Sequence, residues 1–369
     1  MARLHIVQIL PALDEGGVER GTVELNRELV TRGYKSTVIS SGGRLVPSIE
    51  AAGGTHVERP VKSKNPFTAF SRAADLRHLL ARIKPDVVHF RSRVPGWLCV
   101  LANRTLHLPL VSTVHGFNSV SIYSKVMTMG DLVICPSTPI AAHIQQHYHT
   151  PAEKIRLVYR GIDPNAFDPA TVDAAFLKEF RDRFGLNGRY VVLGVGRITP
   201  LKGYDVLIRA TALAAAQDPS IKTVIVGGAE TAREDYAASL RALVAELKME
   251  DRVVFAGSQT KMAEIYAAGN VLVSGNHSKP ESFGRTMAEA LAMNRPVIAT
   301  RFGGALDIVR PDRDGWLVEP GNVQELADRI LSSRTAQFRA LRENALARFS
   351  LDQMVTKTIA VYEEAAARR

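Results

Sequence analysis

The chain has 369 residues, which exceeds the usual size of one domain and predicts two or three. Apolar residues make up 46% and charged residues 23%, the proportions of a globular protein in water. No apolar run reaches the roughly 18 residues that a membrane-spanning helix requires. The two cysteines, Cys99 and Cys135, form no closely spaced motif. That pattern indicates a reducing compartment and gives no sign of a metal site.

The net charge of +10 is unevenly distributed along the sequence. Residues 59–93 contain nine Lys and Arg against two Asp. Such a basic stretch suits an anionic membrane or a phosphorylated acceptor, and the alternative is a solvated surface that keeps the protein soluble. Nucleic acid is the least favoured partner, because no aromatic-rich or helix-turn-helix pattern accompanies the charge.

The N-terminal segment has some features of a short signal peptide. However, His5 and Gln8 interrupt its apolar run, and Asp14 follows where a small-residue cleavage site would stand. We therefore interpret the segment as the first strand of a cytoplasmic protein.

Short apolar runs alternate with helical patterns along the chain, which is the signature of βαβ units and parallel sheets. The strands predicted in the first half are 4–10, 37–39, 87–90, 110–113, 132–135 and 155–158. Those predicted in the second half are 190–195, 223–226, 252–255, 271–273 and 297–299. Helices are predicted between them, among others at 17–31 and 204–216.

A polar segment rich in turn formers, residues 163–189, separates the two series of strands. We predict an α/β protein with two Rossmann-like, doubly wound parallel-sheet domains, at 1–170 and 171–350. A cleft between them would collect the carboxyl ends of both sets of strands, where ligands of open α/β sheets bind.

Two carboxylates, Glu281 and Glu289, stand eight positions apart around the start of a predicted helix. Glu289 lies in an otherwise small and apolar run, where a carboxylate is costly unless something binds it. Helical side chains lean toward the N-terminus, so Glu289 should point back to the helix start that Glu281 borders. The free N–H groups there suit a phosphate. Hydroxyl-binding carboxylates beside an anion site predict a nucleotide sugar.

Two cations, Arg197 and Lys202, follow the predicted strand 190–195 and are five residues apart. They could hold a diphosphate and stabilise the charge that grows as it leaves. A dinucleotide fingerprint fails here, because Thr199 stands at its third glycine position.

In the first half, Gly16-Gly17 precedes a helix and His115-Gly116 follows a strand. Paired glycines let backbone approach a ligand closely, although a plain tight turn explains them equally well. His115 could contact sugar hydroxyls or satisfy only local hydrogen bonds.

The order of these motifs resembles that of family 4 retaining glycosyltransferases of the GT-B fold, over essentially the whole chain. The resemblance implies that Glu289 holds the ribose hydroxyls and that Arg197 and Lys202 hold the diphosphate. It further implies that Glu281 and the backbone near Phe283, Gly284 and Arg285 hold the donor sugar. Gly284 to Thr286 would hold the distal phosphate, Gly17 would lie beneath a phosphate, and His115 beside an outer sugar hydroxyl. The final segment, 351–369, would be a helix that crosses back to the N-terminal domain.

The resemblance also implies retaining front-face chemistry, in which the leaving phosphate accepts the proton of the acceptor. The sequence agrees, since it offers no convincing second carboxylate for double displacement. It departs from the family pattern at Arg160, Asn270 and Asp307, where Asn, Asp and Glu are usual. These departures bear on loop packing more than on the catalytic assignment.

Two metal-like motifs are better explained structurally. Asp312-Arg313-Asp314 lies in a predicted turn. His143 and His147 share a helix face, but Ile144 stands where a zincin has glutamate. We expect neither a metal nor a cofactor.

The N-terminal half should bind the acceptor. Arg91 and Arg93 follow a strand end, and with Lys62 and Lys64 they belong to the basic stretch. Parts of the sequence look like bacterial transferases that act on lipopolysaccharide or related envelope glycans. We expect an envelope glycan or lipid-linked acceptor, with possible peripheral docking at the inner face of the plasma membrane.

Two alternatives remain open. One is a same-fold nucleotide-sugar hydrolase or epimerase, and the other is a non-catalytic membrane-surface binding protein. The sequence identifies neither the base and sugar of the donor, nor the acceptor, nor the oligomeric state.

Overall fold

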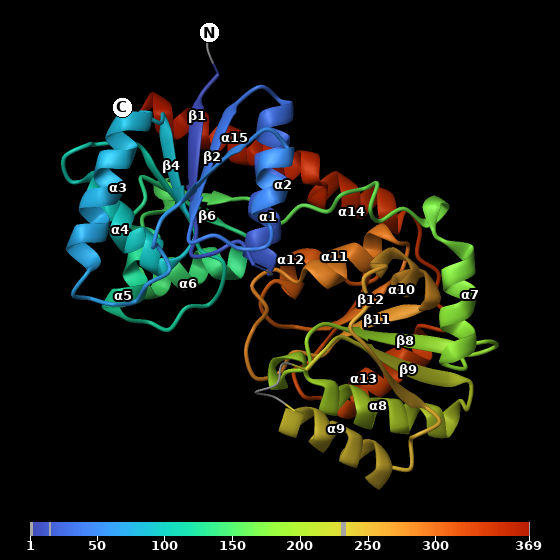
Figure 1. Cartoon of the computed structure of the whole chain (residues 1–369). Coiled ribbons are helices and arrows are strands. Elements are labelled where there is room, and N and C mark those ends of the chain that lie inside the picture. The colour runs from blue at the N-terminus through green and yellow to red at the C-terminus, as the bar shows by residue number, and fades with distance from the viewer. Residues whose placement is uncertain (1–2, 15, 230–233, 369) are drawn as a thin grey trace. The chain divides into compact units, whose positions relative to one another are not determined.

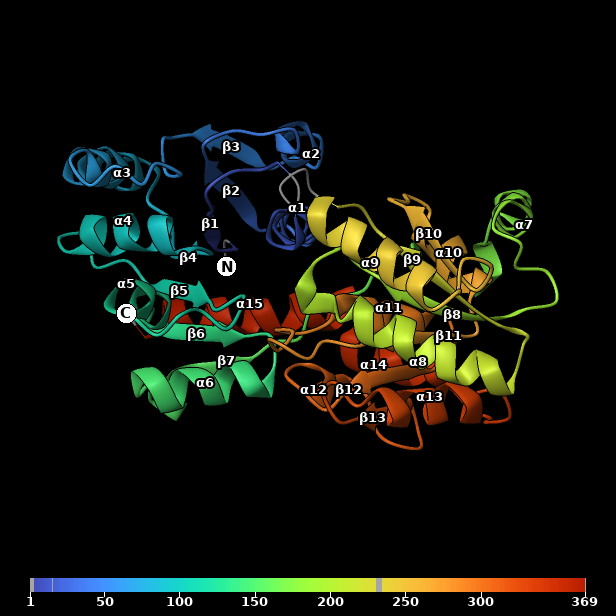
Figure 2. The same ribbon diagram turned by 90° about the horizontal axis from the view of Figure 1, so that it is seen from below.

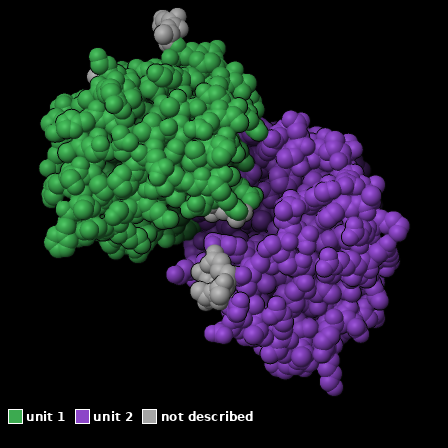
Figure 3. Space-filling model, viewed as in Figure 1, with its two compact units in different colours: residues 1–160, 352–369 green, residues 161–351 purple. Residues whose placement is uncertain are grey.

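The computed structural model describes residues 3–14, 16–229 and 234–368 (Figure 1). The chain forms two compact units, residues 1–160 with 352–369 and residues 161–351 (Figure 3). No helix among the described residues is both long and apolar enough to cross a membrane.

Unit 1 is built on a seven-stranded parallel sheet with the strand order β3-β2-β1-β4-β5-β6-β7. Its strands are β1 (His5–Ile9), β2 (Lys35–Ser40), β3 (Thr55–Glu58), β4 (Val87–Phe90), β5 (Leu110–Thr113), β6 (Leu132–Cys135) and β7 (Ile155–Leu157). Most of these strands are buried along their whole length, as expected when helices cover both faces of a parallel sheet.

The helices of unit 1 lie on both faces of the sheet (Figure 2). They are α1 (Gly17–Thr31), α2 (Val46–Ala51), α3 (Ala69–Ile83), α4 (Arg93–Asn103), α5 (Ile122–Lys125), η1 (Val126–Thr128), α6 (Thr138–Tyr148), η2 (Ala152–Lys154) and α15 (Leu351–Ala367). Figure 2 shows α3, α4, α5 and α6 on one face and α1, α2 and α15 on the other. Right-handed crossovers explain this division, because the chain progresses along the sheet in one direction before β3 and in the other after it.

Helix α15 belongs to unit 1 from Asp352 onward and is held there by side chains of the N-terminal half. The buried His89 ring bonds through Nδ1 to the Tyr362 hydroxyl at 2.7 Å and through Nε2 to the Thr113 hydroxyl at 2.7 Å. On the surface, Arg156 Nε donates to Glu364 Oε2 at 2.8 Å. The last helix therefore completes the packing of unit 1.

Unit 2 contains a six-stranded parallel sheet with the order β10-β9-β8-β11-β12-β13. The strands are β8 (Tyr190–Val195), β9 (Ile221–Val226), β10 (Val253–Gly257), β11 (Val271–Ser274), β12 (Val297–Thr300) and β13 (Gly315–Val318). The helices are η3 (Pro169–Thr171), α7 (Ala174–Arg183), η4 (Pro200–Lys202), α8 (Tyr204–Gln217), α9 (Glu234–Glu246), α10 (Met262–Ala268), α11 (Arg285–Ala292), α12 (Ala305–Ile308), α13 (Val323–Ser332) and α14 (Leu341–Phe349). Figure 1 shows α8, α9 and α13 on one face of the sheet and α10 and α11 on the other.

The predicted α/β class with two doubly wound parallel sheets is confirmed. The sequence placed the first boundary at residue 170, whereas the compact units divide between Arg160 and Gly161. Residues after 160 pack on unit 2, because Ile162 donates its N–H to Phe349 O at 2.8 Å and accepts from Leu351 N at 2.8 Å. Arg342 Nη2 also donates to Pro164 O at 3.0 Å.

Candidate functional site

The order of strands in unit 2 reverses between β8 and β11, and the loops that leave these two strands carry the predicted cation and carboxylate. Lys202 ends η4, after β8, and Glu281 lies on the loop after β11. Lys202 Nζ lies 3.0 Å from Glu281 Oε1 and 2.8 Å from Oε2. The reversal of strand order in an open α/β sheet is where ligands bind. The fold therefore brings this pair to the expected place.

Close backbone contacts fix the loop that carries Lys202. Gly203 adopts φ 63°, and a Cβ there would lie 1.9 Å from Gly275 O on the neighbouring loop. Gly196 adopts φ 144°, and its missing Cβ leaves room for the Lys202 side chain, whose Cε would lie 2.8 Å away. The Tyr204 hydroxyl donates to Gly196 O at 2.8 Å. Glycine at these positions is thus required by the packing that orients the lysine.

Glu289 is 8% exposed, on the second turn of α11. Its Oε2 accepts from the Tyr266 hydroxyl at 2.8 Å, and its Oε1 accepts from Arg285 Nε at 2.9 Å. The Arg285 contact joins residues four apart, with the glutamate leaning toward the helix start as expected. Burial, followed by the charge of Glu289, raises the pKa of Tyr266 well above its usual value. The hydroxyl therefore stays protonated and remains a donor to the carboxylate.

The loop that enters α11 is shaped by glycines. Gly284, at φ 101°, precedes the helix, and a Cβ there would lie 2.0 Å from Met287 Cε. Gly304 donates its N–H to Glu281 O at 2.8 Å and leaves no room for a Cβ beside Phe283 O. Phe283 is buried and packs edge-on against Phe349, with ring centroids 5.6 Å apart. The backbone around Glu281 is therefore held from both sides.

The remaining predicted residues of unit 2, Arg197 and Thr286, lie near the loops that carry Lys202 and Glu281. Arg197 is exposed and lies between β8 and η4, and the adjacent Ile198 N–H donates to Gly228 O at 2.9 Å. Thr286 lies in the first turn of α11 and is partly exposed. Both positions border the loops that carry Lys202 and Glu281.

In unit 1, His115 follows β5 and is oriented by Arg160. Arg160 Nη2 lies 2.7 Å from His115 Nδ1. Because a guanidinium can only donate, Nδ1 accepts and the ring proton is on Nε2. Nε2 is buried and has no hydrogen-bond partner within the described parts of the chain. Burial first, and then the charges of Arg160 and Arg91, lower the pKa of His115 well below its usual value, so the ring is neutral.

Gly17 is the first residue of α1, and no described atom lies within 4 Å of the position that a Cβ would occupy. The open space beside this helix start agrees with a backbone that a ligand can approach.

The four basic residues predicted for the acceptor or membrane differ in exposure. Arg91 is only 5% exposed, and its Nη1 donates to Gln8 Oε1 at 2.8 Å, so it is not a surface cation. Arg93 is partly exposed, and its Nη1 donates to the Ser124 hydroxyl at 3.2 Å. Lys62 and Lys64 are exposed. The strand end turns Arg91 inward because Gln8, on the adjacent β1, offers a buried amide oxygen.

The metal-like motifs have structural partners. Asp314 is buried and pairs with Arg310 Nε at 2.7 Å and with Arg348 Nη1 at 3.4 Å. His143 Nε2 lies 3.3 Å from Asn118 O, and its ring centroid is 4.7 Å from that of His147. Over the described parts of the chain, no group of three or more His, Cys, Asp or Glu side chains is arranged to hold a metal ion.

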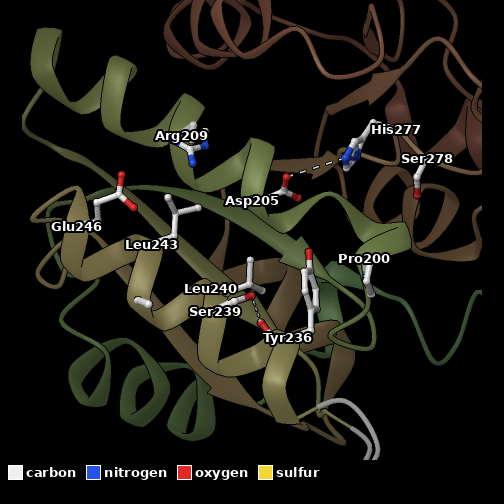
Figure 4. A pocket seen from close by; sticks show the side chains of 11 residues that line it. Pro200, Asp205, Arg209, Tyr236, Ser239, Leu240, Leu243, Glu246, His277 and Ser278 are labelled. Atoms are coloured by element: carbon white, nitrogen blue, oxygen red, sulfur yellow. Dashed lines mark hydrogen bonds and ion pairs between the residues drawn. The ribbon is translucent and has the colours of Figure 1, made fainter.

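A cavity of about 430 Å³ lies beside the Lys202 loop, between Pro200, α8, α9 and the segment that leads to Glu281 (Figure 4). Figure 4 shows Asp205 and His277 next to each other along one side of it, with Oδ2 and Nε2 3.9 Å apart. His277 Nδ1 is buried and has no hydrogen-bond partner among the residues that the structure describes. The Tyr236 hydroxyl is buried beside Asp205. Burial, followed by the charge of Asp205, raises the pKa of Tyr236 to about 12. At about 30 Å³ per water molecule, the cavity has room for several waters that would bridge these groups.

Both halves of the chain match models of known families. Residues 15–166 match the model described as Glycosyltransferase Family 4, and residues 177–345 match Glycosyl transferases group 1. A D-inositol 3-phosphate glycosyltransferase of Acidothermus cellulolyticus is 30% identical over 96% of this chain and 87% of its own length.

Solved structures share the fold over nearly the whole chain. A glycosyltransferase from Rickettsia africae has a TM-score of 0.91 at 28% identity, covering 100% of both chains. The Anabaena protein HepE, in complex with UDP and glucose, has a TM-score of 0.83 at 21% identity, covering 98% of this chain and 100% of its own. At that identity the second likeness concerns the fold alone.

In each unit, the sequence did not point to one residue that contacts a predicted side chain: Tyr266 in unit 2 and Arg160 in unit 1. Tyr266 comes from α10, and no spacing relates it to Glu289. Arg160 was noted only as a departure from a family pattern, although it orients His115. The Arg285 contact could have been found, because its spacing of four from Glu289 is that of a helical ion pair.

Proposed function

The chain belongs to the glycosyltransferases of the GT-B fold, and from this premise we propose that it moves a hexose-type sugar, with retention, from a nucleotide-diphosphate sugar to an envelope glycan acceptor. The observation that carries the donor assignment is the Lys202–Glu281 pair at the reversal of strand order in unit 2. A cation and a hydroxyl-binding carboxylate are thereby held together where such sheets bind their ligands.

Lys202 and Arg197 would bind the diphosphate of the donor. Lys202 is paired with Glu281 and is partly buried, so its ammonium group is already positioned. An incoming diphosphate shares this ammonium group with Glu281, and the carboxylate remains available to accept a hydroxyl of the sugar. Fixed cations next to the leaving group stabilise the charge that develops in the transition state.

Glu289 would bind the ribose hydroxyls. Its two oxygens can only accept, and the contacts from Tyr266 and Arg285 hold the carboxylate in place. Ionised carboxylates accept hydrogen bonds from hydroxyl groups such as those of a ribose. A carboxylate held rigid on both oxygens loses little freedom when the ribose binds.

The start of α11 would bind the distal phosphate and the sugar through backbone groups. Gly284, Arg285 and Thr286 carry N–H groups at the helix start, and the preceding Phe283 is buried and fixed. His115, with its proton on Nε2, would donate to an outer sugar hydroxyl, and Gly17 would allow close approach of a phosphate.

For the reaction we propose front-face substitution. The bond between the anomeric carbon and the leaving phosphate lengthens while the acceptor hydroxyl approaches on the same face. The acceptor oxygen then forms the new bond to the anomeric carbon as the bond to the leaving phosphate breaks. The leaving phosphate takes the acceptor proton, and Lys202 and Arg197 stabilise the nucleoside diphosphate until it is released. Glu281 stabilises positive charge on the sugar. The roles of these residues rest on their positions in the fold and on the family resemblance.

For the acceptor we propose an anionic envelope glycan, such as lipopolysaccharide or a lipid-linked saccharide, reached at the inner face of the plasma membrane. The basic stretch of unit 1, residues 59–93, supports an anionic acceptor, and Arg93 and Lys64 are among its accessible cations. The Acidothermus relative is named as a glycosyltransferase of D-inositol 3-phosphate, which is likewise an anion.

The proposal is tested by incubating the protein with UDP, GDP and ADP sugars, first alone and then with envelope glycolipid. The matching donor should raise the melting temperature, since ligand at about 100 times its dissociation constant adds about 2.7 kcal/mol. A new glycoside whose anomeric configuration equals that of the donor supports the full proposal. Free or altered sugar without glycoside would instead indicate a hydrolase or epimerase. Absence of any product would indicate a binding protein.

A further inference from the structure

An apolar groove of about 520 Å³ lies on unit 1, between α3, α4, α5 and the segment that precedes α3. Figures 1 and 2 both show α3 and α4 side by side. Its apolar lining residues are Pro66, Ala69, Val94, Trp97, Leu98, Leu101 and Tyr123. This volume lies in the range of pockets that hold small organic ligands.

One hydrogen bond and one cation–π contact fix the aromatic side chains of the groove. Trp97 Nε1 donates to Tyr123 O at 3.0 Å, so the indole is anchored at its polar edge and presents its ring to the groove. The Arg93 guanidinium stacks 5.2 Å from the centroid of the Tyr123 ring. The aromatic wall therefore persists without a ligand.

Large apolar side chains protrude into solvent on both sides of this groove. Phe67 is 94% exposed and Phe70 is 75% exposed, in the turn before α3 and in its first turn. On the other side, Ile122 is 82% exposed, next to Tyr123 in α5. Contiguous exposed apolar groups on a water-facing surface mark a site of interaction with a membrane or a partner.

Cations frame the apolar surface. Lys64, Arg72 and Arg93 line the groove, and no Asp or Glu is among its described lining residues. Arg72 donates to three neutral acceptors of the described chain, namely the Thr68 hydroxyl, Pro60 O and Asn65 O. Its charge therefore faces no carboxylate within the groove. Aromatic side chains ringed by Lys and Arg match the chemistry of an anionic lipid surface, with apolar chains below phosphate headgroups.

We propose that this groove and its rim dock the protein on a bilayer that contains anionic phospholipid. Phe67 and Phe70 insert among the lipid chains, and Lys64, Arg72 and Arg93 meet the headgroup phosphates. The groove along Trp97 receives one acyl chain. The inference rests on the proposed function in one respect, because an envelope acceptor would be presented at such a surface.

The first experiment measures binding of the full chain to two kinds of vesicle. One contains phosphatidylcholine with about 30% phosphatidylglycerol, which gives an anionic surface, and the other contains phosphatidylcholine alone, which gives a neutral surface. The chain has two tryptophans, so a Trp316→Phe variant leaves Trp97 as the only indole. Anionic vesicles should bind the protein, shift Trp97 emission to shorter wavelength, and release the protein as salt rises. Equal binding to both kinds of vesicle, or an unchanged Trp97 spectrum on bound protein, would overturn the proposal.

Variants locate the contact. Phe67→Ser with Phe70→Ser should weaken vesicle partitioning at least ~10-fold, and Lys64→Glu at least ~5-fold. The matched controls are Leu213→Ser, an exposed apolar residue of unit 2, and Lys35→Glu, an exposed lysine at the start of β2. Both controls should bind as the wild type does. Equal losses in variants and controls would refute this surface.

Donor binding, measured by thermal shift on the same samples, keeps the two proposals separate. A wild type that is stabilised by a nucleotide sugar but ignores anionic vesicles refutes the docking surface and leaves the proposed function intact. A wild type that binds vesicles through Phe67 and Phe70 but responds to no nucleotide sugar supports the docking surface and refutes the proposed function.

Discussion

The Lys202–Glu281 pair allows a test that separates catalysis from stability. The side chains are 19% and 25% exposed, between the exposed and fully buried extremes. Loss of one partner should therefore lower the free energy of unfolding by about 1–2 kcal/mol. The loss of one electrostatic contact to the reacting centre should cut turnover by at least ~10²-fold, or about 2.7 kcal/mol of transition-state stabilisation.

Four variants make the comparison: Glu281→Gln, Lys202→Ala, the double exchange Lys202→Glu with Glu281→Lys, and the control Glu319→Gln. Glu319 pairs with Arg301 at 3.0 Å on the surface of the same unit. Each single variant at the site should lose turnover, while the control should keep it. The double exchange restores opposite charges and should recover most of the stability but not the activity, because the cation then stands where the sugar hydroxyl needs a carboxylate.

Turnover is followed as release of nucleoside diphosphate from the donor found in the sugar panel, and unfolding is followed in urea. Near-normal turnover in either single variant would remove the catalytic assignment. Recovery of turnover by the double exchange would show that the pair serves only to hold the loops together.

Three further predictions concern the packing around the site. Tyr266→Phe removes the hydroxyl that donates to buried Glu289. The variant should lower the free energy of unfolding by about 1.5–3 kcal/mol and raise the KM for the donor. An unchanged free energy of unfolding in urea would contradict this contact. Burial lowers the pKa of both His89 and His115, so below pH about 6.5 the unfolded chain binds protons that the folded chain does not. Stability should therefore fall as the pH decreases, by up to about 1.4 kcal/mol per pH unit for each ring, and His89→Gln should flatten the profile measured in urea between pH 7.5 and 5.5. Gly203→Ala introduces a Cβ against a backbone oxygen at positive φ and should cost at least about 2 kcal/mol, and a melting temperature equal to that of the wild type would refute the contact.

The sequence was sufficient for most of the strands, including the edge strands β7 and β10, and insufficient for two others. Continuous apolar runs predicted strands such as β4 and β5 to the residue, because both faces of a parallel sheet are covered. The sequence patterns did not predict β3 and β13, each of which lies at one edge of its sheet. In β3, with the sequence THVE, every residue is at least partly exposed, so no apolar run marks the strand.

The candidate site shows a similar division. Local spacing predicted that Glu289 leans toward the helix start and that Lys202 lies beside the same ligand site. It could not predict Tyr266, whose contact depends on the packing of α10 against α11, or the burial of Arg91, which depends on a neighbouring strand. The functional roles assigned to these residues stay predictions until the variants are measured.

The assignment of α15 to unit 1 has a consequence for how the protein is made. Unit 2 is one continuous stretch of the sequence, residues 161–351, whereas unit 1 is assembled from two separated stretches. During synthesis, unit 2 can fold as soon as its last strand and helices leave the ribosome. His89, made early, must wait for Tyr362, its partner in α15, until all of unit 2 has been translated. The strands of unit 1 are thus synthesised before unit 2, and the helix that completes their packing is synthesised after it.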